Sequence, residues 1–478
     1  MDRAFPDRLG RSAWMLSLSA ILLVMLAAYP VLMQNGWLAT HVQASWWCVV
    51  VWIVGYASII LSDARGLWSP AAIYFVIFAF FHFGLAATVL LGGTYEDITW
   101  FMDPEVPYAF SLVGLGGIGL ALGSLGPAVV RIVVYRRGDF SAEVQPFLSE
   151  ELSFRYAIFA RLLAAISSTL AIFCIVAWIL MTIIATGGRL FGLRYGEFLA
   201  ATEGYPRPWI TFGLAFGVSL AAVDLTQRAA KWAMACFLGW MLIALPIGLR
   251  GAVMFPAAGA LAAQGWKLMR YRAWYFLLGG LMVFCLASAL REIRQEGLAD
   301  TAWRWDMANP AHTMRELGES LRPTYETVRW INDGDRYLAG ESFWAPLERG
   351  FLRLFAINKR DATDEERQLI EMVDKRVGPI GFSPVAEAFY NFGAVGVVIV
   401  MGLIGAVLAL LGMGRSSVLG RALMIATLLP LLVFVRNSFA QVPGQMVVTW
   451  SVVLGVWFLA GIIAARLSPF GVSLSERR

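Results

Sequence analysis

The chain has 478 residues, of which 59% are hydrophobic and 15% charged, with a formal net charge of +5. Soluble globular domains carry about 25% charged residues, so this composition excludes an ordinary soluble fold and indicates an integral membrane protein. The basic residues sort by membrane side, so the positive charge does not point to nucleic acid. All four cysteines lie in apolar runs, which leaves neither a disulfide framework nor a cysteine-based zinc site.

Apolar stretches of about 20 residues, long enough to cross a bilayer, recur along the whole chain. They lie near 13–33, 44–62, 70–92, 106–130, 162–187, 209–225, 231–248, 250–266, 274–290, 383–412, 418–435 and 445–465. The sequence therefore predicts an all-α, polytopic integral membrane protein with about 12 transmembrane helices, or roughly 11–13. The first run lacks a small-residue cleavage site, so we expect it to be a retained helix.

The distribution of Lys and Arg predicts the orientation in the membrane. With the N-terminus taken as cytoplasmic, the short inner segments hold eighteen basic residues and the short outer loops hold five. This asymmetry predicts that both termini are cytoplasmic in a bacterial inner membrane. Residues 1–291 then carry nine helices, 292–382 form a large periplasmic loop, and 383–478 carry three helices and a cytoplasmic tail.

The long loop contains apolar residues at helical spacing, which predicts amphipathic helices that pack onto the membrane domain. The two sets are Leu317, Leu321, Tyr325 and Val328, and then Phe343, Leu347, Phe351, Leu354 and Phe355.

A Gly-x-Gly-x-x-Gly pattern at Gly114, Gly116 and Gly119 lies within an apolar helix and follows no strand. A dinucleotide site is therefore disfavoured. Together with Gly123, the pattern gives a small-residue face that predicts close packing of two membrane helices.

The chain contains three histidines. His82 lies mid-membrane, where an interhelical hydrogen bond is favoured over a proton relay. His41 lies in a short outer loop without recognisable partners. His312 precedes a charged run in the long outer segment, which makes it a candidate acid or base, although a solvated loop histidine is the common alternative.

Arg250 and Arg436 each follow an apolar run and begin a turn at the predicted outer face, where basic residues are disfavoured. Each guanidinium either reaches lipid phosphate or forms a fixed clamp for pyrophosphate, whose oxygens suit its bidentate geometry. The first outer loop, 34–43, contains no carboxylate, which argues against protein-glycosylating transferases that place an acidic pair there. The chain also lacks a Walker motif and an His-Glu-x-x-His helix.

Several outer-face motifs resemble those of the bacterial O-antigen or oligosaccharide repeat-unit polymerases, the Wzy-type membrane glycosyltransferases. They are Leu-Pro-Ile-Gly-Leu-Arg-Gly at 245–251, Arg-Glu-Leu-Gly-Glu-Ser-Leu-Arg at 315–322, the Gly-Phe-Ser-Pro to Asn-Phe-Gly stretch at 381–396, Arg-Asn-Ser-Phe at 436–439, and Arg-Tyr-Gly-Glu at 194–197.

The resemblance implies a GT-C-like membrane glycosyltransferase fold, with undecaprenyl-pyrophosphate-linked oligosaccharides as substrates, and neither a cofactor nor a metal. It implies pyrophosphate binding by Arg250, Arg322, Arg436 and Arg194, and glycan binding by Tyr195, Tyr390 and Asn391. Glu387 is the leading general base, with Glu316 and His312 as reserves. Glu387 pairing with an outer arginine is the structural alternative. Membrane lipids are further partners, and a chain-length regulator is a candidate partner.

Two alternatives stay open at this point. An O-antigen ligase-like transferase would move a finished glycan instead of a repeat unit. A lipid-linked oligosaccharide flippase would catalyse no reaction, but it calls for charged residues inside many helices, and such residues are scarce here.

Overall fold

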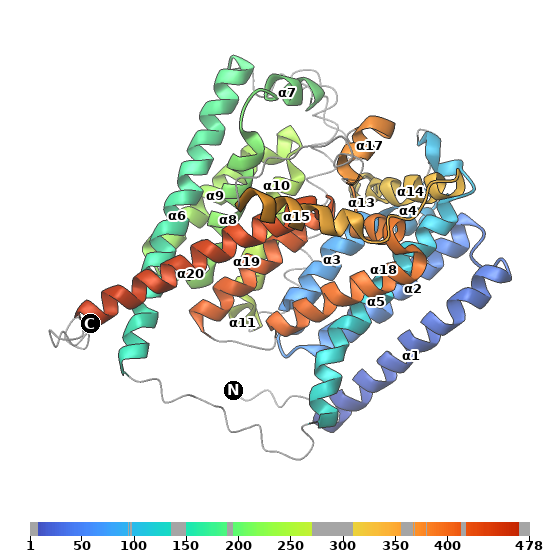
Figure 1. Ribbon diagram of the computed structural model, residues 1–478, viewed down its shortest axis with the longest axis horizontal. Coiled ribbons are helices and arrows are strands. Elements are labelled where there is room, and N and C mark those ends of the chain that lie inside the picture. Colours follow the sequence, from blue (N-terminus) through green and yellow to red (C-terminus); the bar gives the residue numbers. More distant parts are fainter. Residues whose placement is uncertain are drawn as a thin grey trace.

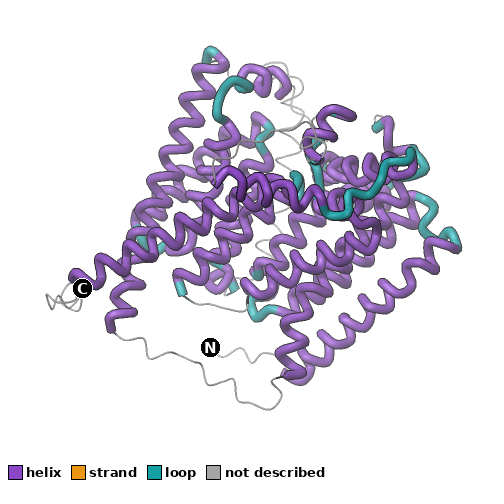
Figure 2. The backbone as a smooth tube through the Cα atoms, viewed as in Figure 1, coloured by secondary structure: helices purple, strands orange, loops and turns teal. Residues whose placement is uncertain are grey.

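The computed structural model of the protein describes residues 8–93, 95, 98–134, 150–188, 195–269, 309–354, 367, 369–378, 380–412 and 417–467. Within these ranges the regular structure is entirely helical (Figure 2). Among the described residues, seven helices are long and apolar enough to cross a membrane, and an eighth crossing results if one bent pair counts as a single span. The protein is thus a polytopic, all-helical membrane protein.

The described helices form two neighbouring groups (Figure 1). The first group contains α1 (Arg8–Gln34), α2 (His41–Ser62), α3 (Pro70–His82), α4 (Gly84–Leu90), α5 (Val106–Val134) and α18 (Pro384–Gly412). The second contains α6 (Glu150–Thr186), α7 (Tyr195–Ala201), α8 (Arg207–Ala221), α9 (Arg228–Ile247), α10 (Arg250–Ala263), α11 (Gly265–Leu268), α19 (Val418–Phe434) and α20 (Val442–Leu467). Contacts of α19 with α18 and of α10 with α3 join the two groups.

Four helices gather at one end of the bundle, and we call them the cap (Figure 1). The cap consists of α13 (Pro310–Gly318), α14 (Arg322–Asn332), α15 (Glu341–Leu354) and α17 (Leu369–Val377), with the short η5 (Glu319–Leu321) between α13 and α14. Leu317, Leu321, Tyr325 and Val328 are at most 4% exposed and belong to the main apolar core. The prediction that amphipathic residues of this segment pack onto the membrane domain is confirmed for this first set, whereas Leu347 of the second set is 44% exposed and does not pack inward.

The described residues contain fewer long, straight spans than the sequence pattern predicts for the same ranges. Helices α8, α10 and α19 have 15, 14 and 17 residues, which is short for a crossing. The apolar run 70–92 is not one straight helix, because α3 and α4 meet at an angle of 60°. The predicted span 274–290 lies outside the described residues. Hydropathy reports the length of an apolar stretch but not bends within it. This explains why the run 70–92 was predicted as one straight span.

Local side-chain chemistry sets several helix starts. Thr40 and Gln43 form a reciprocal capping box that begins α2, and the Ser69 hydroxyl accepts the Ala72 N–H at the start of α3. Asn309 Oδ1 accepts the Ala311 N–H at 3.0 Å where α13 begins. These polar residues fix where α2, α3 and α13 begin.

The small-residue face on α5 packs directly against α18. A Cβ added to Gly119 would meet the carbonyl of Val398, and one added to Gly123 would meet the carbonyl of Gly402. Gly405 of α18 lies equally close to the backbone of α5 at Leu120. The predicted role of this face in close helix packing is confirmed, and the close contact lies along the middle of α18.

Candidate active site

The break between α3 and α4 is the framework of the candidate site. Gly84 follows the break, and a Cβ there would collide with the carbonyl of Met314 and approach Gly318 in α13. A Cβ on Gly318 would in turn collide with the backbone of Leu85. Neither position has space for a side chain, because the backbones of α4 and α13 are in direct contact there. This contact packs α13 against the bend and brings its polar residues to the edge of the bundle.

Arg250 and Glu316 form the central ion pair of this region. The Arg250 Nη1 donates to Glu316 Oε2 at 2.6 Å, joining the first residue of α10 to α13 across 66 positions of sequence. Gly248, with φ of 93°, ends α9 in the left-handed conformation and so allows the tight turn that presents Arg250. The Arg250 side chain is 9% exposed and the Glu316 side chain 22%, so this pair lies at the margin of the solvent.

Arg436 also lies close to this bend. Its guanidinium is 5.7 Å from the ring of Phe81, and Phe81 in turn contacts Phe255 of α10 at 6.3 Å. The buried His82 bonds through Nε2 to the Val435 carbonyl at 3.1 Å, which fixes the segment that carries Arg436. An interhelical hydrogen bond was the favoured interpretation of His82, and it is confirmed.

Arg322 begins α14 and pairs locally with Glu326, Nε to Oε1, at 3.3 Å. Two residues further on, Thr324 bonds to the hydroxyl of Ser383 at 3.3 Å. The adjacent Phe382 donates its N–H to the Arg436 carbonyl at 3.1 Å. Arg322 and Arg436 therefore lie on segments that are joined through 382–383, while convergence of the three guanidinium groups stays a prediction.

Glu387 is 1% exposed, and both of its carboxylate oxygens accept hydrogen bonds. Ser342 Oγ donates to Oε1 at 2.8 Å, and the Phe439 N–H donates to Oε2 at 2.7 Å. Asn391 donates from Nδ2 to Ser342 Oγ and to the Glu387 carbonyl, both at 2.7 Å. Among the described residues, the Glu387 carboxylate is held by these neutral donors and forms no ion pair with an outer arginine. This geometry favours a positioning role.

The remaining predicted residues are spread over the cap end. His312 lies one helical turn before Glu316 on the same face of α13, and its imidazole makes no hydrogen bond within the described part of the chain. His41 bonds through Nε2 to the Phe101 carbonyl at 2.7 Å. Arg194 lies outside the described residues, and Tyr195 is described only as the first backbone position of α7.

Tyr325 and Asp335 at the cap end have shifted pKa values. Burial raises the pKa of Tyr325 to about 12, and the hydrogen bond that its hydroxyl donates to Asp103 adds to this effect. Burial also raises the pKa of Asp335, but hydrogen bonds from Arg376 at 2.5 Å and Tyr390 at 2.7 Å outweigh it and hold the pKa below its usual value of 3.8. The ionised Asp335 thus ties the end of α14 to α17 and α18.

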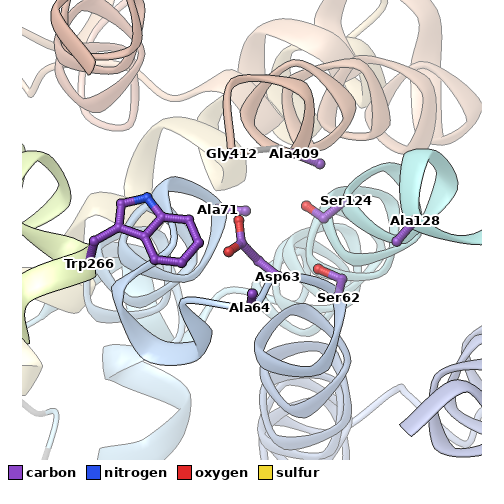
Figure 3. Close-up of a pocket in the computed structure, with 9 residues that line it drawn as sticks. All are labelled: Ser62, Asp63, Ala64, Ala71, Ser124, Ala128, Trp266, Ala409 and Gly412. Atoms are coloured by element: carbon purple, nitrogen blue, oxygen red, sulfur yellow. The ribbon is translucent and has the colours of Figure 1, made fainter. Parts of the chain in front are cut away.

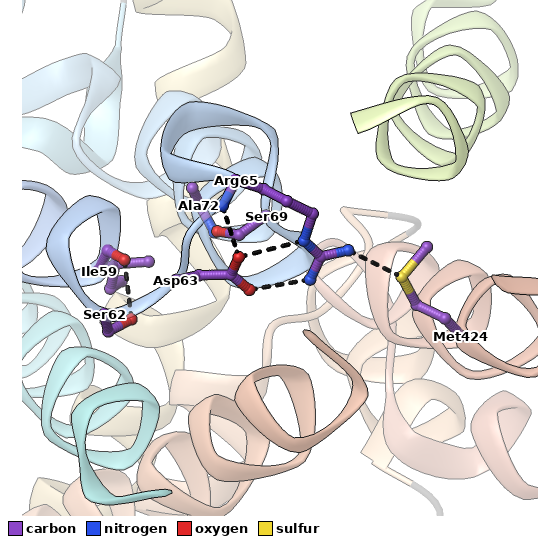
Figure 4. Close-up of polar contacts among 7 residues, drawn as sticks. All are labelled: Ile59, Ser62, Asp63, Arg65, Ser69, Ala72 and Met424. Carbon is purple, nitrogen blue, oxygen red and sulfur yellow. Dashed lines mark hydrogen bonds and ion pairs between the residues drawn. The ribbon is translucent and has the colours of Figure 1, made fainter. Parts of the chain in front are cut away.

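A cavity of about 150 Å³ lies at the far end of the bundle from the cap (Figure 3). Asp63, Ser124, Trp266 and Gly412 are among its lining residues, and none of the predicted site residues contributes to it. Figure 4 shows the adjacent ion pair, in which Arg65 Nη2 lies 2.8 Å from Asp63 Oδ2. Arg65 also contacts the Met424 sulfur, so this buried pair joins the α2–α3 loop to α19.

Sequence reasoning missed several residues that shape the cap end. Ser342 connects Glu387 to Asn391, and Asp335 connects Arg376 to Tyr390, but neither belongs to a recognisable motif. The bend at Phe83 left no signal in the hydropathy. Across the described ranges, no group of three or more His, Cys, Asp or Glu side chains is placed to hold a metal ion.

The helical fold and the Arg250–Glu316 pair beside a broken helix define a polytopic membrane protein with a charged site at the cap end. The chain belongs to the O-antigen polysaccharide polymerase Wzy family, whose sequence profile matches residues 15–466. The resemblance found in the sequence is thereby confirmed.

The chain is also similar to Protein CapE of Staphylococcus aureus, with 25% identity over 224 residues. The match covers 45% of this chain and 48% of CapE, so it spans about half of the relative's length. No solved structure matches the chain.

Proposed function

We propose that this protein polymerises lipid-pyrophosphate-linked oligosaccharide repeat units by glycosyl transfer at the outer face of a bacterial inner membrane. Membership of the Wzy family supports this reaction class. The observation that carries the proposal within the structure is the Arg250–Glu316 pair at 2.6 Å, which places a guanidinium and a carboxylate together at the edge of the bundle.

The arginines bind the substrate pyrophosphate. The leaving group carries negative charge when the bond to the anomeric carbon breaks, and fixed guanidinium donors stabilise that charge most where water is excluded. Arg250 is nearly buried, and Arg436 is exposed beside Phe81 on the same bend. Arg322 and Arg194 are the further candidates, and together they form one clamp.

The acceptor hydroxyl attacks the anomeric carbon of the donor, its proton passes to a base, and the lipid pyrophosphate leaves with the bonding electron pair. Direct displacement inverts the anomeric configuration. Glu316 becomes the leading base, because its side chain keeps 22% exposure beside Arg250. His312, one turn away, is the reserve. Glu387 acts as a positioning residue, since both of its oxygens are already occupied.

The candidate glycan-binding residues lie near the starts of α18 and α7. Asn391 is 1% exposed and hydrogen-bonded to Ser342, and the Tyr390 hydroxyl is bonded to Asp335. Both therefore shape the glycan site, while Tyr195 of the predicted outer loop contacts the sugar directly.

The topology proposed from the basic residues places both termini in the cytoplasm and the cap in the periplasm. The cap end holds Arg250, Arg436 and the polar network, whereas Arg65, Arg228 and Lys267 lie at the far end. Counting α8, α10, α19 and the run 274–290 as crossings, beside the eight possible spans, gives about 12 helices. We also propose that the helices have a GT-C-like arrangement and that a chain-length regulator is a candidate partner of the protein.

The test is the surface polysaccharide of a deletion strain, separated as a silver-stained ladder. A polymerase predicts single repeat units attached to the lipid core in the deletion strain and a restored ladder with the wild-type gene. Glu316→Gln should fail to restore the ladder, and Glu203→Gln, at an exposed position beyond α7, should restore it. Absence of any attached unit would indicate a ligase, and repeat units trapped on the cytoplasmic side would indicate a flippase.

A further inference from the structure

Helix α15 turns an apolar face outward. Ser342 and Ala345 are 3% and 2% exposed and point into the protein, whereas Trp344 and Leu347 are 63% and 44% exposed. A surface helix in water buries its apolar stripe, so the exposure of Trp344 and Leu347 departs from the usual order. An exposed apolar face of this kind marks an interaction surface.

A polar edge of α15 borders this face. Glu341 and Glu348 both approach Arg367, at 3.8 Å and 3.0 Å. The two glutamates are seven positions apart and lie on one side of the helix, where Glu341 precedes Trp344 by three positions and Glu348 follows it by four, so they border the apolar face formed by Trp344 and Leu347. The helix therefore has an ionic edge that water can solvate and, next to it, an apolar face that favours a nonpolar environment.

The apolar face continues into the lateral surface of the spanning helices. Phe343 stacks on Phe392 of α18, with ring centroids 6.2 Å apart and planes at 4°. Beyond the kink at Gly393, a row of exposed residues follows one face of α18, with Val395 at 70%, Ile399 at 56% and Leu403 at 62%, and Phe392, which is 47% exposed, stands just before it. Because α18 is a candidate span, this row faces lipid.

Helix α20, which also contacts α15, exposes Val447 and Val448 at its cap end in the same way. Figure 1 shows α15 near the cap ends of α18 and α20. The outward face of α15 is thus bordered by two lipid-facing surfaces.

We infer that α15 is an interfacial helix whose outward face, Trp344 and Leu347, lies in the headgroup–acyl boundary of the leaflet on the cap side. The partner is phospholipid, because the face is continuous with lipid-facing rows and carries a tryptophan, whose ring suits that boundary. The ionic edge with Arg367 then faces the aqueous phase.

This placement has a consequence for the site, which rests on the proposed function. Ser342 projects from the inner face of the same helix and bonds to Glu387 and Asn391 at 2.8 Å and 2.7 Å. A helix anchored in the leaflet on one side and bonded to the site on the other fixes the depth of the site relative to the lipid headgroups. The pyrophosphate of a membrane-embedded substrate lies at that depth.

The location is tested with the full-length protein in nanodiscs of phosphatidylethanolamine and phosphatidylglycerol, in a background whose native cysteines are alanine. A spin label is attached at Trp344→Cys, and its accessibility to oxygen and to a water-soluble nickel complex is measured. Ile399→Cys serves as the lipid reference and Asp333→Cys, 67% exposed in its side chain, as the aqueous reference. We expect position 344 to favour oxygen over nickel and to lie between the references. A value equal to the aqueous reference overturns the inference, whatever the polymerase activity.

The coupling to the site is tested without labels or cysteine replacements. Trp344→Asp should deplete long-chain polymer, Trp344→Phe should retain it, and the matched charge at Asn332→Asp on the exposed end of α14 should have no effect. Protein levels in the membrane fraction are measured beside the ladder. Full polymer from a normally abundant Trp344→Asp variant overturns the coupling.

Discussion

Arg250 and Arg436 both lie close to the α3–α4 bend, and the planar shape of their guanidinium groups determines which ligands they bind. Lysine keeps the positive charge but loses the planar fork that binds two oxygens at once. We predict that Arg250→Lys and Arg436→Lys each lower the rate of polymer formation by about tenfold or more, in line with the loss of one preorganised donor. The measurement is turnover of a lipid-linked repeat unit by the purified protein.

Arg207→Lys is the matched control for these variants. Arg207 also begins a helix at the cap end, but it bonds to Thr202 at 3.1 Å and lies in α8, away from the bend. Normal activity in all three variants would mean that Arg250 and Arg436 only reach lipid phosphate.

Glu387 gives a second prediction at the residue scale. A positioning residue and a general base differ in how strongly their replacement lowers the stability of the protein. The carboxylate accepts from Ser342 Oγ and from the Phe439 N–H, so the amide nitrogen of Glu387→Gln must face a donor at one of these sites. An unsatisfied buried donor costs about 1–3 kcal/mol. We predict that Glu387→Gln lowers both the melting temperature and the turnover, and that Ser342→Ala lowers them in the same direction. Lost turnover at an unchanged melting temperature would return the general-base role to Glu387.

At the scale of elements, the contact of α13 with the α3–α4 bend holds Glu316 against Arg250. The two glycines at this contact, Gly84 and Gly318, leave no space for a Cβ against the opposing backbone. Overpacking of this kind costs about 1–3 kcal/mol and displaces the neighbouring element. We predict that Gly84→Ala and Gly318→Ala each abolish long-chain polymer, read from the surface ladder.

Gly239→Ala in α9 is the control for the glycine variants. A Cβ at Gly239 meets nothing within 4 Å, and alanine favours a helix over glycine by about 1 kcal/mol. This variant should keep its ladder. Wild-type polymer from Gly84→Ala would show that the bend does not position the ion pair.

The same elements show how far the sequence leads. The runs that became α1, α2, α5, α6, α9, α18 and α20 were predictable, because about 20 apolar residues have few alternatives to a membrane helix. The face around Gly119 was predictable for a similar reason, since small residues at this spacing serve close packing. The bend between α3 and α4 was not, because it depends on α13 packing at Gly84, far away in sequence.

The site was predictable as a set of residue types but not as a geometry. Arg250 and Arg436 were noted as charges at predicted helix ends and Glu316 through its family-like motif, and Arg250 and Glu316 do form a pair. The sequence could not show that Glu387 would be enclosed by Ser342 and Phe439, because those donors come from two other segments of the chain. Site residues that belong to local motifs could be predicted from the sequence. Interactions that depend on tertiary contacts could not.

At the scale of the whole molecule, the proposed reaction requires the cap to lie outside the cytoplasm. We predict that a cysteine at Asp333, on the exposed end of α14, reacts with a membrane-impermeant maleimide in intact spheroplasts. A cysteine at the exposed Lys231, near the start of α9 at the far end of the bundle, should react only after the membrane is permeabilised. The reason is the eighteen-to-five excess of basic residues in the segments at the far end. The reverse labelling pattern would place the Arg250–Glu316 site in the cytoplasm, where the proposed periplasmic glycosyl transfer could not occur.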